Sequence, residues 1–305
     1  FDLYDYYKSS GCDLISVDSA MIYKQMDIGT AKPNNTELKK YPHALVNIKN
    51  PDEIYSAGDF YNDAKIEIKK SLDNNRTPIL VGGTMMYYNS LFKGLSDLPK
   101  KDDKIREKIE LKAKNTSWEH LHIKLSKIDP TAANKINKND TQRITRALEI
   151  YEITGKGISH FWEQEYNLNK QDEDKFEYII IGLDLDRKLL HQRIEQRFDI
   201  MLENNFLGEV KNLMQIKNLT CEHPAMKSVG YRQAWNYLSS KLSNKDDISF
   251  DEFKESALVA TRRLAKHQCT WMRSFSKSDY NFKIFDVTNG TPIKIIKIIK
   301  EYLKI

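Results

Sequence analysis

The chain has 305 residues, enough for about two domains and a sizeable hydrophobic core. Hydrophobic residues at 40% and aromatic residues at 10% indicate a folded globular protein rather than a disordered one. The 48 Lys and Arg residues slightly exceed the 43 Asp and Glu residues, so the net charge of +5 permits an anionic partner without indicating one. No apolar run approaches about 18 residues and the first residues lack a signal-peptide pattern, so we expect a cytoplasmic protein without a membrane partner.

The first ten residues have the pattern of a helix that stops at Ser10 and Gly11 and leads directly into a strand. A helix in this position is the second half of a strand-helix unit. We therefore expect about 20 further residues before Phe1, the size of a strand with its turn and helix start.

Three apolar runs, residues 14–17, 79–81 and 178–183, are predicted to be strands of one parallel sheet. Turn or capping residues and a helical pattern follow each of them, as is typical of an α/β fold. Outside the segment between the second and third strands, helices are predicted over residues 57–72, after Asp186, and over residues 253–275. The chain is predicted to end with a strand over 282–287 and a helix over 292–303.

Residues 99–172 contain no predicted strand. Charged helical patterns cover residues 103–114, 117–126, 130–136 and 141–153 instead. A long helical stretch between two strands of a sheet indicates a separate subdomain. We therefore divide the chain into a first core part (1–98), a helical insertion (99–172) and a second core part with C-terminal helices (173–305).

Two segments place polar groups at the predicted carboxyl edge of the sheet, where ligands bind in open α/β folds. Asp18 and Ser19 follow the first strand, and Gly82, Gly83 and Thr84 follow the second. Glycines let a ligand approach the backbone, and a helix N-terminus offers N–H groups to an anion. The alternative interpretation is structural: Asp18 and Ser19 cap the next helix, and Thr84 is the N-cap of a tight turn.

Three further segments concentrate basic and polar side chains at helical spacing: residues 142–146, 227–235 and 261–273. In the last of these, Arg262, Lys266 and Arg273 are predicted to lie opposite an apolar side with Leu264 and Trp271. Arginines beside Gln and Thr suit contacts to phosphates and base edges. They equally suit surface ion pairs, so no single segment decides between the two. The cysteines and histidines have no metal-ligand spacing, and no metal site is predicted within the chain.

Taken together, the segments resemble the tRNA dimethylallyltransferase family. The matching residues occur in the family's order from about residue 11 to about residue 285. They are Ser16-Val-Asp-Ser19 through Asp27-Ile-Gly-Thr-Ala-Lys-Pro33, Val81-Gly-Gly-Thr84 with Gly94-Leu-Ser96, Asp140 with residues 142–146, Gly230-Tyr-Arg-Gln233, and Thr261-Arg-Arg-Leu-Ala-Lys266 with Trp271 and Arg273.

The resemblance implies a P-loop-type parallel-sheet core with an inserted all-helical subdomain that binds tRNA. The implied reaction transfers a dimethylallyl group from dimethylallyl diphosphate to the exocyclic amine of the adenosine just 3′ of the anticodon. Asp18 would be the general base. Thr84 and Arg232 would stabilise the diphosphate, with Mg²⁺ as cofactor. We expect a monomer whose tRNA partner is the anticodon stem-loop.

The resemblance also assigns contacts with tRNA. These residues are Asp18, Ser19, Ala20, Met21, Thr84, Arg106, Gln142, Arg143, Ile144, Thr145, Arg146, Lys227, Ser228, Val229, Gly230, Tyr231 and Arg232. The family's glycine-rich phosphate loop does not occur in these residues, so the diphosphate contacts other than Arg232 are expected in the segment before Phe1.

Two other hypotheses remain open at this point. A small-molecule or nucleotide kinase would share the core, although an insertion of about 70 residues with Arg143 and Arg146 is larger than the connections usual in such folds. A protein that binds tRNA without transferring a group would also fit, since the phosphate loop is not among these residues.

Overall fold

The computed structural model describes residues 4–5, 11–94, 98–162, 176–243, 247–278, 281–289, 296–297 and 300–301. These residues form two compact units, one from residues 1–88 and 177–305 and the other from residues 89–176. The helices predicted over the first ten residues and over 292–303 fall mostly outside the described residues. Leu95 and Ser96, which belong to the matching family residues, also fall outside them.

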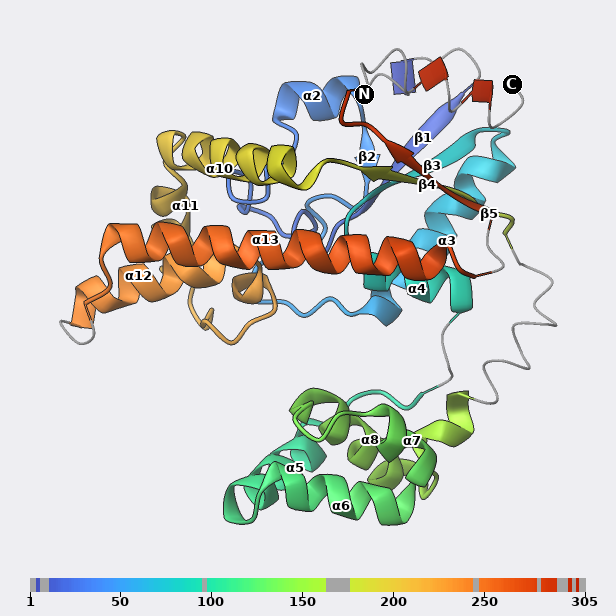
Figure 1. Cartoon of the computed structure of the whole chain (residues 1–305), viewed down its shortest axis with the longest axis vertical. Helices are drawn as coiled ribbons and strands as arrows, with labels where there is room; N and C mark the ends of the chain where they lie inside the picture. Colours follow the sequence, from blue (N-terminus) through green and yellow to red (C-terminus); the bar gives the residue numbers. More distant parts are fainter. Residues whose placement is uncertain are drawn as a thin grey trace. The chain divides into compact units, whose positions relative to one another are not determined.

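The strands of the first unit form two parallel sheets (Figure 1). In one, β1 (Cys12–Val17) lies between β2 (His43–Ala44) and β3 (Thr77–Gly82); in the other, β4 (Ile179–Asp184) pairs with β5 (Asn281–Asp286). The predicted runs do form strands, but the prediction that they share one sheet is wrong for the described residues. An apolar run shows that a strand is buried and does not show which strand it pairs with.

The register of the first sheet brings the two predicted polar segments together. Val17 pairs with Gly82, so β1 and β3 end side by side at the same edge. An added Cβ on Gly82 would lie 2.1 Å from the carbonyl oxygen of Val17, and no side chain fits there. Asp18 and Gly83 therefore leave the sheet as neighbours.

Several α-helices begin in the described part of the first unit. They are α2 (Asn35–Lys40), α3 (Ala57–Asp73), α4 (Met85–Lys93), α10 (Arg187–Glu203), α11 (Phe206–Leu213), α12 (Tyr231–Ser243) and α13 (Phe250–Phe275). Local capping explains where two of them begin, because Ser56 and Ser249 form capping boxes with Asp59 and Glu252. Helix α13 runs beside α10 and α12 (Figure 1).

Aromatic rings fill the space between α10, α11, α12 and α13. Phe206 meets Tyr231 edge to face at 5.2 Å between ring centroids, and Phe198 lies 5.8 Å from Phe253. Tyr237 stacks on Phe253 at 5.0 Å. Such ring pairs stabilise a fold beyond the area that they bury, so the start of α12 is held firmly against α11.

The described residues of the second unit form helices and the loops between them, and none of them forms a strand. Its helices are α5 (Asp103–Asn115), α6 (Trp118–Ile128), α7 (Pro130–Lys135) and α8 (Thr141–Thr154), close to the four predicted patterns. Leu121, Leu125, Ile144, Leu148 and Ile150 are fully buried and form its core. In the described part of both units, no helix is long and apolar enough to cross a membrane.

Candidate active site

Asp18 directly follows β1, and the two oxygens of its carboxylate differ in their hydrogen bonding. Oδ1 accepts hydrogen bonds from the backbone N–H groups of Ala20 (2.8 Å) and Met21 (3.1 Å). Residues 19–25 form turns, so Asp18 shapes a turn and does not cap a helix. Within the described ranges Oδ2 has no hydrogen-bond partner, and the side chain is half-buried. One oxygen is therefore fixed and the other is open to a ligand.

Thr84 lies opposite Asp18 and is joined to the same turn. Its hydroxyl oxygen accepts a hydrogen bond from the Ser19 N–H at 2.9 Å and donates to the Ser19 hydroxyl at 3.2 Å. The Thr84 N–H donates to the carbonyl oxygen of Val17 at 3.1 Å. The two predicted segments thus form one hydrogen-bonded group at the sheet edge, with α4 beginning immediately after it.

Gln268 of α13 supports this group from the other side, which the sequence analysis missed. Its side-chain N–H donates to the carbonyl oxygen of Gly83 at 3.0 Å. A Cβ on Gly83 would lie 2.4 Å from the Gln268 amide nitrogen, so a larger residue there would displace the Gln268 side chain. Gln268 lay within a segment interpreted only by its basic residues, and its own partner is 185 positions away in sequence.

Glu209 of α11 is a second residue that the sequence analysis missed. Its carboxylate accepts the N–H groups of Asp27 (2.8 Å), Ile28 (2.7 Å) and Gly29 (3.1 Å). It also accepts the hydroxyl of Tyr231 at 2.5 Å. Three successive backbone donors on one carboxylate make a fixed anchor, because charge-assisted hydrogen bonds are the strong ones. No local pattern predicts it, since the partners lie about 180 residues away.

The anchor links the segment after Asp18 to the start of α12, where Arg232 lies. Tyr231 is fully buried, and burial together with Glu209 raises the pKa of its hydroxyl, which stays protonated and donates to Glu209. The Arg232 side chain is exposed and has no hydrogen-bond partner within the described residues. Arg232 is thus placed through Tyr231 and Glu209, and no described contact joins it directly to Asp18 or Thr84.

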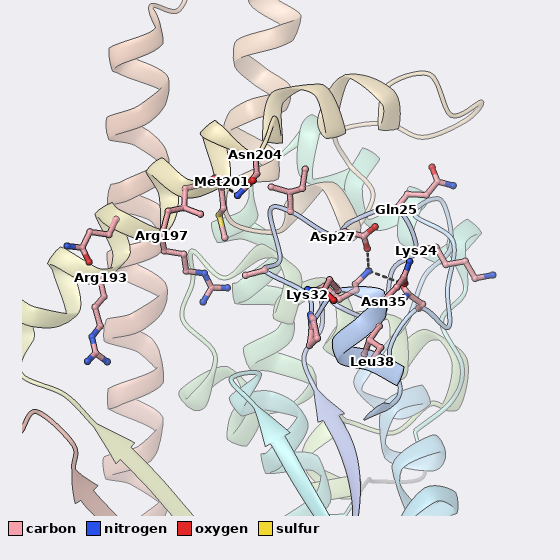
Figure 2. Close-up of a pocket in the computed structure, with 17 residues that line it drawn as sticks. Lys24, Gln25, Asp27, Lys32, Asn35, Leu38, Arg193, Arg197, Met201 and Asn204 are labelled. Atoms are coloured by element: carbon pink, nitrogen blue, oxygen red, sulfur yellow. Dashed lines mark hydrogen bonds and ion pairs between the residues drawn. The ribbon is translucent and has the colours of Figure 1, made fainter. Parts of the chain in front are cut away.

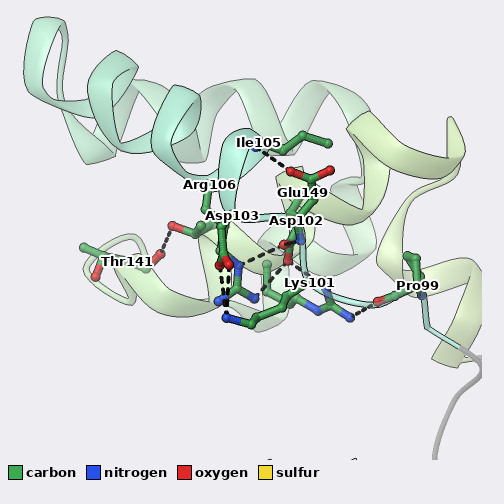
Figure 3. Close-up of polar contacts among 10 residues, drawn as sticks. Pro99, Lys101, Asp102, Asp103, Ile105, Arg106, Thr141 and Glu149 are labelled. Atoms are coloured by element: carbon green, nitrogen blue, oxygen red, sulfur yellow. Dashed lines mark hydrogen bonds and ion pairs between the residues drawn. The ribbon is translucent and has the colours of Figure 1, made fainter. Parts of the chain in front are cut away.

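The second unit holds an ion network around Glu149 (Figure 3). The side chain of Glu149 is 0% exposed, and it accepts hydrogen bonds from Arg106 Nε (2.8 Å), Arg106 Nη2 (3.0 Å) and Arg146 Nη1 (2.6 Å). The N–H of Asp102 adds a fourth at 2.8 Å. Burial alone would raise the pKa of Glu149, but these hydrogen bonds outweigh it and lower that pKa. Arg106 therefore ties α5 to α8, and Arg146 adds a bond to Glu149 within α8.

This packing narrows the set of side chains that the second unit presents for binding. Ile144 is fully buried in the core, and the Thr145 hydroxyl donates to the carbonyl oxygen of Thr141 at 2.8 Å. Gln142 is exposed, and the Arg143 side chain is 72% exposed and paired with Asp140. Of residues 142–146, Gln142 and Arg143 are the two whose side chains face solvent most fully.

The resemblance implies Mg²⁺, which prefers oxygen ligands in octahedral geometry. Within the described ranges, no three acidic, histidine or cysteine side chains gather closely enough to hold a metal ion. Asp18 also uses one oxygen for its own turn. These residues do not form a protein-only magnesium site, and no step below runs through the ion.

The sequence profile of a family described as IPP transferase matches residues 21–275. The chain belongs to the IPP transferase family. This family member is 44% identical over 292 residues to a tRNA dimethylallyltransferase from Coxiella burnetii, covering 96% of this chain and 92% of that one. It is 43% identical over 279 residues to tRNA dimethylallyltransferase 2 of Hahella chejuensis, covering 88% and 82%.

Solved structures of IPP transferase relatives have the same fold. The full-length tRNA isopentenylpyrophosphate transferase of Bacillus halodurans aligns with a TM-score of 0.67 and 31% identity, covering 99% of this chain and 90% of that one. A eukaryotic dimethylallyltransferase acting on tRNA aligns with a TM-score of 0.77 and 24% identity, covering 99% and 75%. The comparison with the eukaryotic protein shows a shared fold only.

Proposed function

We propose that the chain transfers a dimethylallyl group from dimethylallyl diphosphate to the exocyclic amine of the adenosine next to the anticodon of tRNA. The observation that carries the proposal is the free Oδ2 of Asp18, held at the carboxyl edge of the β1–β3 sheet beside the Thr84 hydroxyl in a member of this family. The protein would act as a monomer in the cytoplasm.

In the proposed reaction the amine nitrogen bonds to the first carbon of the dimethylallyl group. The bond from that carbon to the diphosphate oxygen breaks, and its electron pair leaves with the diphosphate. The amine proton passes to Asp18 Oδ2, the oxygen that makes no hydrogen bond within the described ranges. Because Oδ1 is fixed by the N–H groups of Ala20 and Met21, the accepting oxygen keeps its position.

The leaving diphosphate gains negative charge, which donors must stabilise. In our proposal Thr84 and Arg232 do this. The Thr84 hydroxyl now donates to the Ser19 hydroxyl at 3.2 Å, a long bond that it can exchange for a phosphate oxygen. The exposed Arg232 guanidinium is free to pair with phosphate. On the second unit, the exposed Gln142 and Arg143 would contact the RNA.

The test is a transfer assay with tRNA and dimethylallyl diphosphate, in parallel with measurements of tRNA binding. Asp18→Ala should lower kcat by about 100- to 10,000-fold, the usual contribution of a general base, and leave the Kd for tRNA within a few-fold. Asp52→Ala is the matched control, because Asp52 is exposed and its side chain makes no hydrogen bond or ion pair within the described ranges. Wild-type turnover by the Asp18 variant would rule out the base assignment.

A second arm of the assay supplies ATP with small-molecule acceptors in place of the prenyl donor and tRNA. Phosphoryl transfer there, without prenyl transfer to tRNA, would favour the kinase hypothesis and reject the proposal. Transfer to tRNA that stops when its target adenosine is replaced would support it, since the proposed nucleophile is the exocyclic amine of that base.

A further inference from the structure

A cavity of about 980 Å³ lies beside the segment that follows Asp18 (Figure 2). One wall comes mainly from residues 24–38, and the other comes from α10 between Arg193 and Asn204. None of the residues assigned above to catalysis or to tRNA contact lines it. The volume is at the upper end of the range for ligand pockets, so it accommodates more than a bare diphosphate.

Positive charge dominates the lining. Four cationic side chains, Lys24, Lys32, Arg193 and Arg197, line the cavity with one carboxylate, Asp27. That carboxylate is already neutralised, because it pairs with Lys32 at 2.7 Å. Arg193 and Arg197 are four residues apart on α10 and therefore share a face of the helix. The cavity thus presents an uncompensated positive surface.

Arg193 and Arg197 of α10 have no acidic partner among the described residues that would neutralise them. Within the described ranges, no carboxylate pairs with Arg193 or Arg197, and Arg197 donates to the carbonyl oxygen of Thr30 at 3.1 Å. By contrast, Arg262 of α13 pairs with Glu195 at 2.5 Å and Glu255 at 3.4 Å. Glu195, on the same helix as the two arginines, is therefore already paired elsewhere.

The remaining lining is both apolar and rich in amides. Ile28, Pro33, Leu38 and Met201 offer apolar surface. Three amide side chains, Gln25, Asn35 and Gln196, make no hydrogen bond within the described residues and offer donors and acceptors. Apolar surface suits the face of a base or a sugar, while amides suit base edges and arginines suit phosphates. Inorganic phosphate or a short prenyl diphosphate would leave the amides unused.

The cavity is rigid at its base and lies near the candidate active site. Lys32, whose side chain is 2% exposed, donates to the carbonyl oxygen of Tyr23, to Asp27 and to Asn47, each at 2.7 Å. Burial lowers the pKa of Lys32, and the negative charges of Asp27, Glu209 and Asp18 oppose that shift. The lining residues Asp27 and Ile28 donate their N–H groups to Glu209, which also binds Tyr231 next to Arg232, so the cavity lies beside the candidate active site.

We propose that this cavity binds a nucleotide unit of the substrate RNA other than the base that reacts, with Arg193 and Arg197 on its phosphate. The inference rests on the proposed function in taking tRNA as the RNA. An RNA chain bound at the candidate active site passes close to this cavity, because Glu209 joins the lining residues Asp27 and Ile28 to Tyr231, the neighbour of Arg232. The amide side chains then contact a neighbouring nucleotide.

The test measures the Kd of the full chain for an anticodon stem-loop RNA at several salt concentrations, without turnover. The double variant Arg193→Ala/Arg197→Ala should raise Kd by roughly tenfold or more and reduce the slope of log Kd against log salt by about 1 to 2. The control is Arg187→Ala/Lys188→Ala, which removes the same charge from exposed positions of α10 outside the cavity.

Arg193→Ala alone is the variant least expected to disturb folding, because the exposed Arg193 side chain makes no hydrogen bond or ion pair within the described residues. Arg193→Lys should restore part of the affinity. An RNA affinity equal to that of the control would overturn the proposal. So would a raised KM for dimethylallyl diphosphate with unchanged RNA binding, which would place a small diphosphate in the cavity. RNA binding is measured here without any transfer of the dimethylallyl group. If the wild-type protein binds the RNA through these arginines but transfers no group, the proposed function is refuted and the inference about the cavity stands.

Discussion

The Glu209 anchor gives the sharpest prediction about this structure. Glu209→Gln keeps the size of the side chain but replaces one acceptor oxygen with an amide that donates. The carboxylate now accepts four hydrogen bonds, three of them from the N–H groups of Asp27, Ile28 and Gly29. A hydrogen bond to a charged group contributes about 1.5–3 kcal/mol, and such contributions do not simply add. We therefore expect the variant to lose about 2–4 kcal/mol of local stability.

The assay is hydrogen exchange of those three amides in the native protein. A loss of about 2–4 kcal/mol in the free energy of local opening corresponds to exchange that is roughly 30- to 1,000-fold faster. Glu203→Gln is the control, because Glu203 is exposed and its side chain makes no hydrogen bond or ion pair within the described ranges. Unchanged exchange at residues 27–29 in the Glu209 variant would refute the anchor.

Other substitutions test separate parts of the structure. Gly82→Ala brings a methyl group within 2.1 Å of the Val17 carbonyl oxygen and should destabilise the first unit by about 1–3 kcal/mol in urea unfolding; an unchanged midpoint would contradict the close approach of β1 and β3. Glu149→Gln leaves Arg106 and Arg146 facing a neutral group and should cost the second unit about 3–5 kcal/mol at neutral pH. Folding lowers the pKa of Glu149, so its contribution to stability is complete above the ordinary glutamate pKa of about 4.3. The difference in unfolding free energy between wild type and variant should therefore shrink as pH falls below that value. A difference that does not depend on pH would contradict the network. Arg143→Ala should weaken tRNA binding with a smaller salt slope, and equal slopes would remove it from the proposed RNA surface.

Local patterns predicted the helices well because their signals lie within a few residues. The helix predicted over 103–114 is observed as Asp103–Asn115, with the Asp102 side chain accepting from the N–H of Ile105 at 3.0 Å. The same holds for 141–153, observed as Thr141–Thr154, with Asp140 capping its start. The place of Asp18 and Thr84 at one sheet edge followed from parallel strands alone, and the register of Val17 with Gly82 confirms it.

Features that depend on distant partners escaped the sequence analysis. The pairing of β4 with β5 joins strands about 100 residues apart, and Glu209 reaches donors about 180 residues away. The apolar side predicted for the helix over 253–275 is also partly wrong, since Leu264 is 43% exposed. Helix α13 buries Phe253, Ala257 and Leu258 near its start and Phe275 at its end. Helical periodicity identifies the apolar face of a helix. The neighbouring helices and strands determine how much of the length of that face is buried.

The division into two units, each with its own hydrophobic core, bears on how the stability of this chain is defined. A protein with two cooperative units has no single melting temperature, because each unit loses structure at its own midpoint. The tryptophans happen to separate the two transitions: Trp118 and Trp162 pack against the core of the second unit, whereas Trp235 and Trp271 belong to the first. Replacing one pair with phenylalanine would leave a fluorescence signal from one unit, and each half of the chain could then be followed on its own.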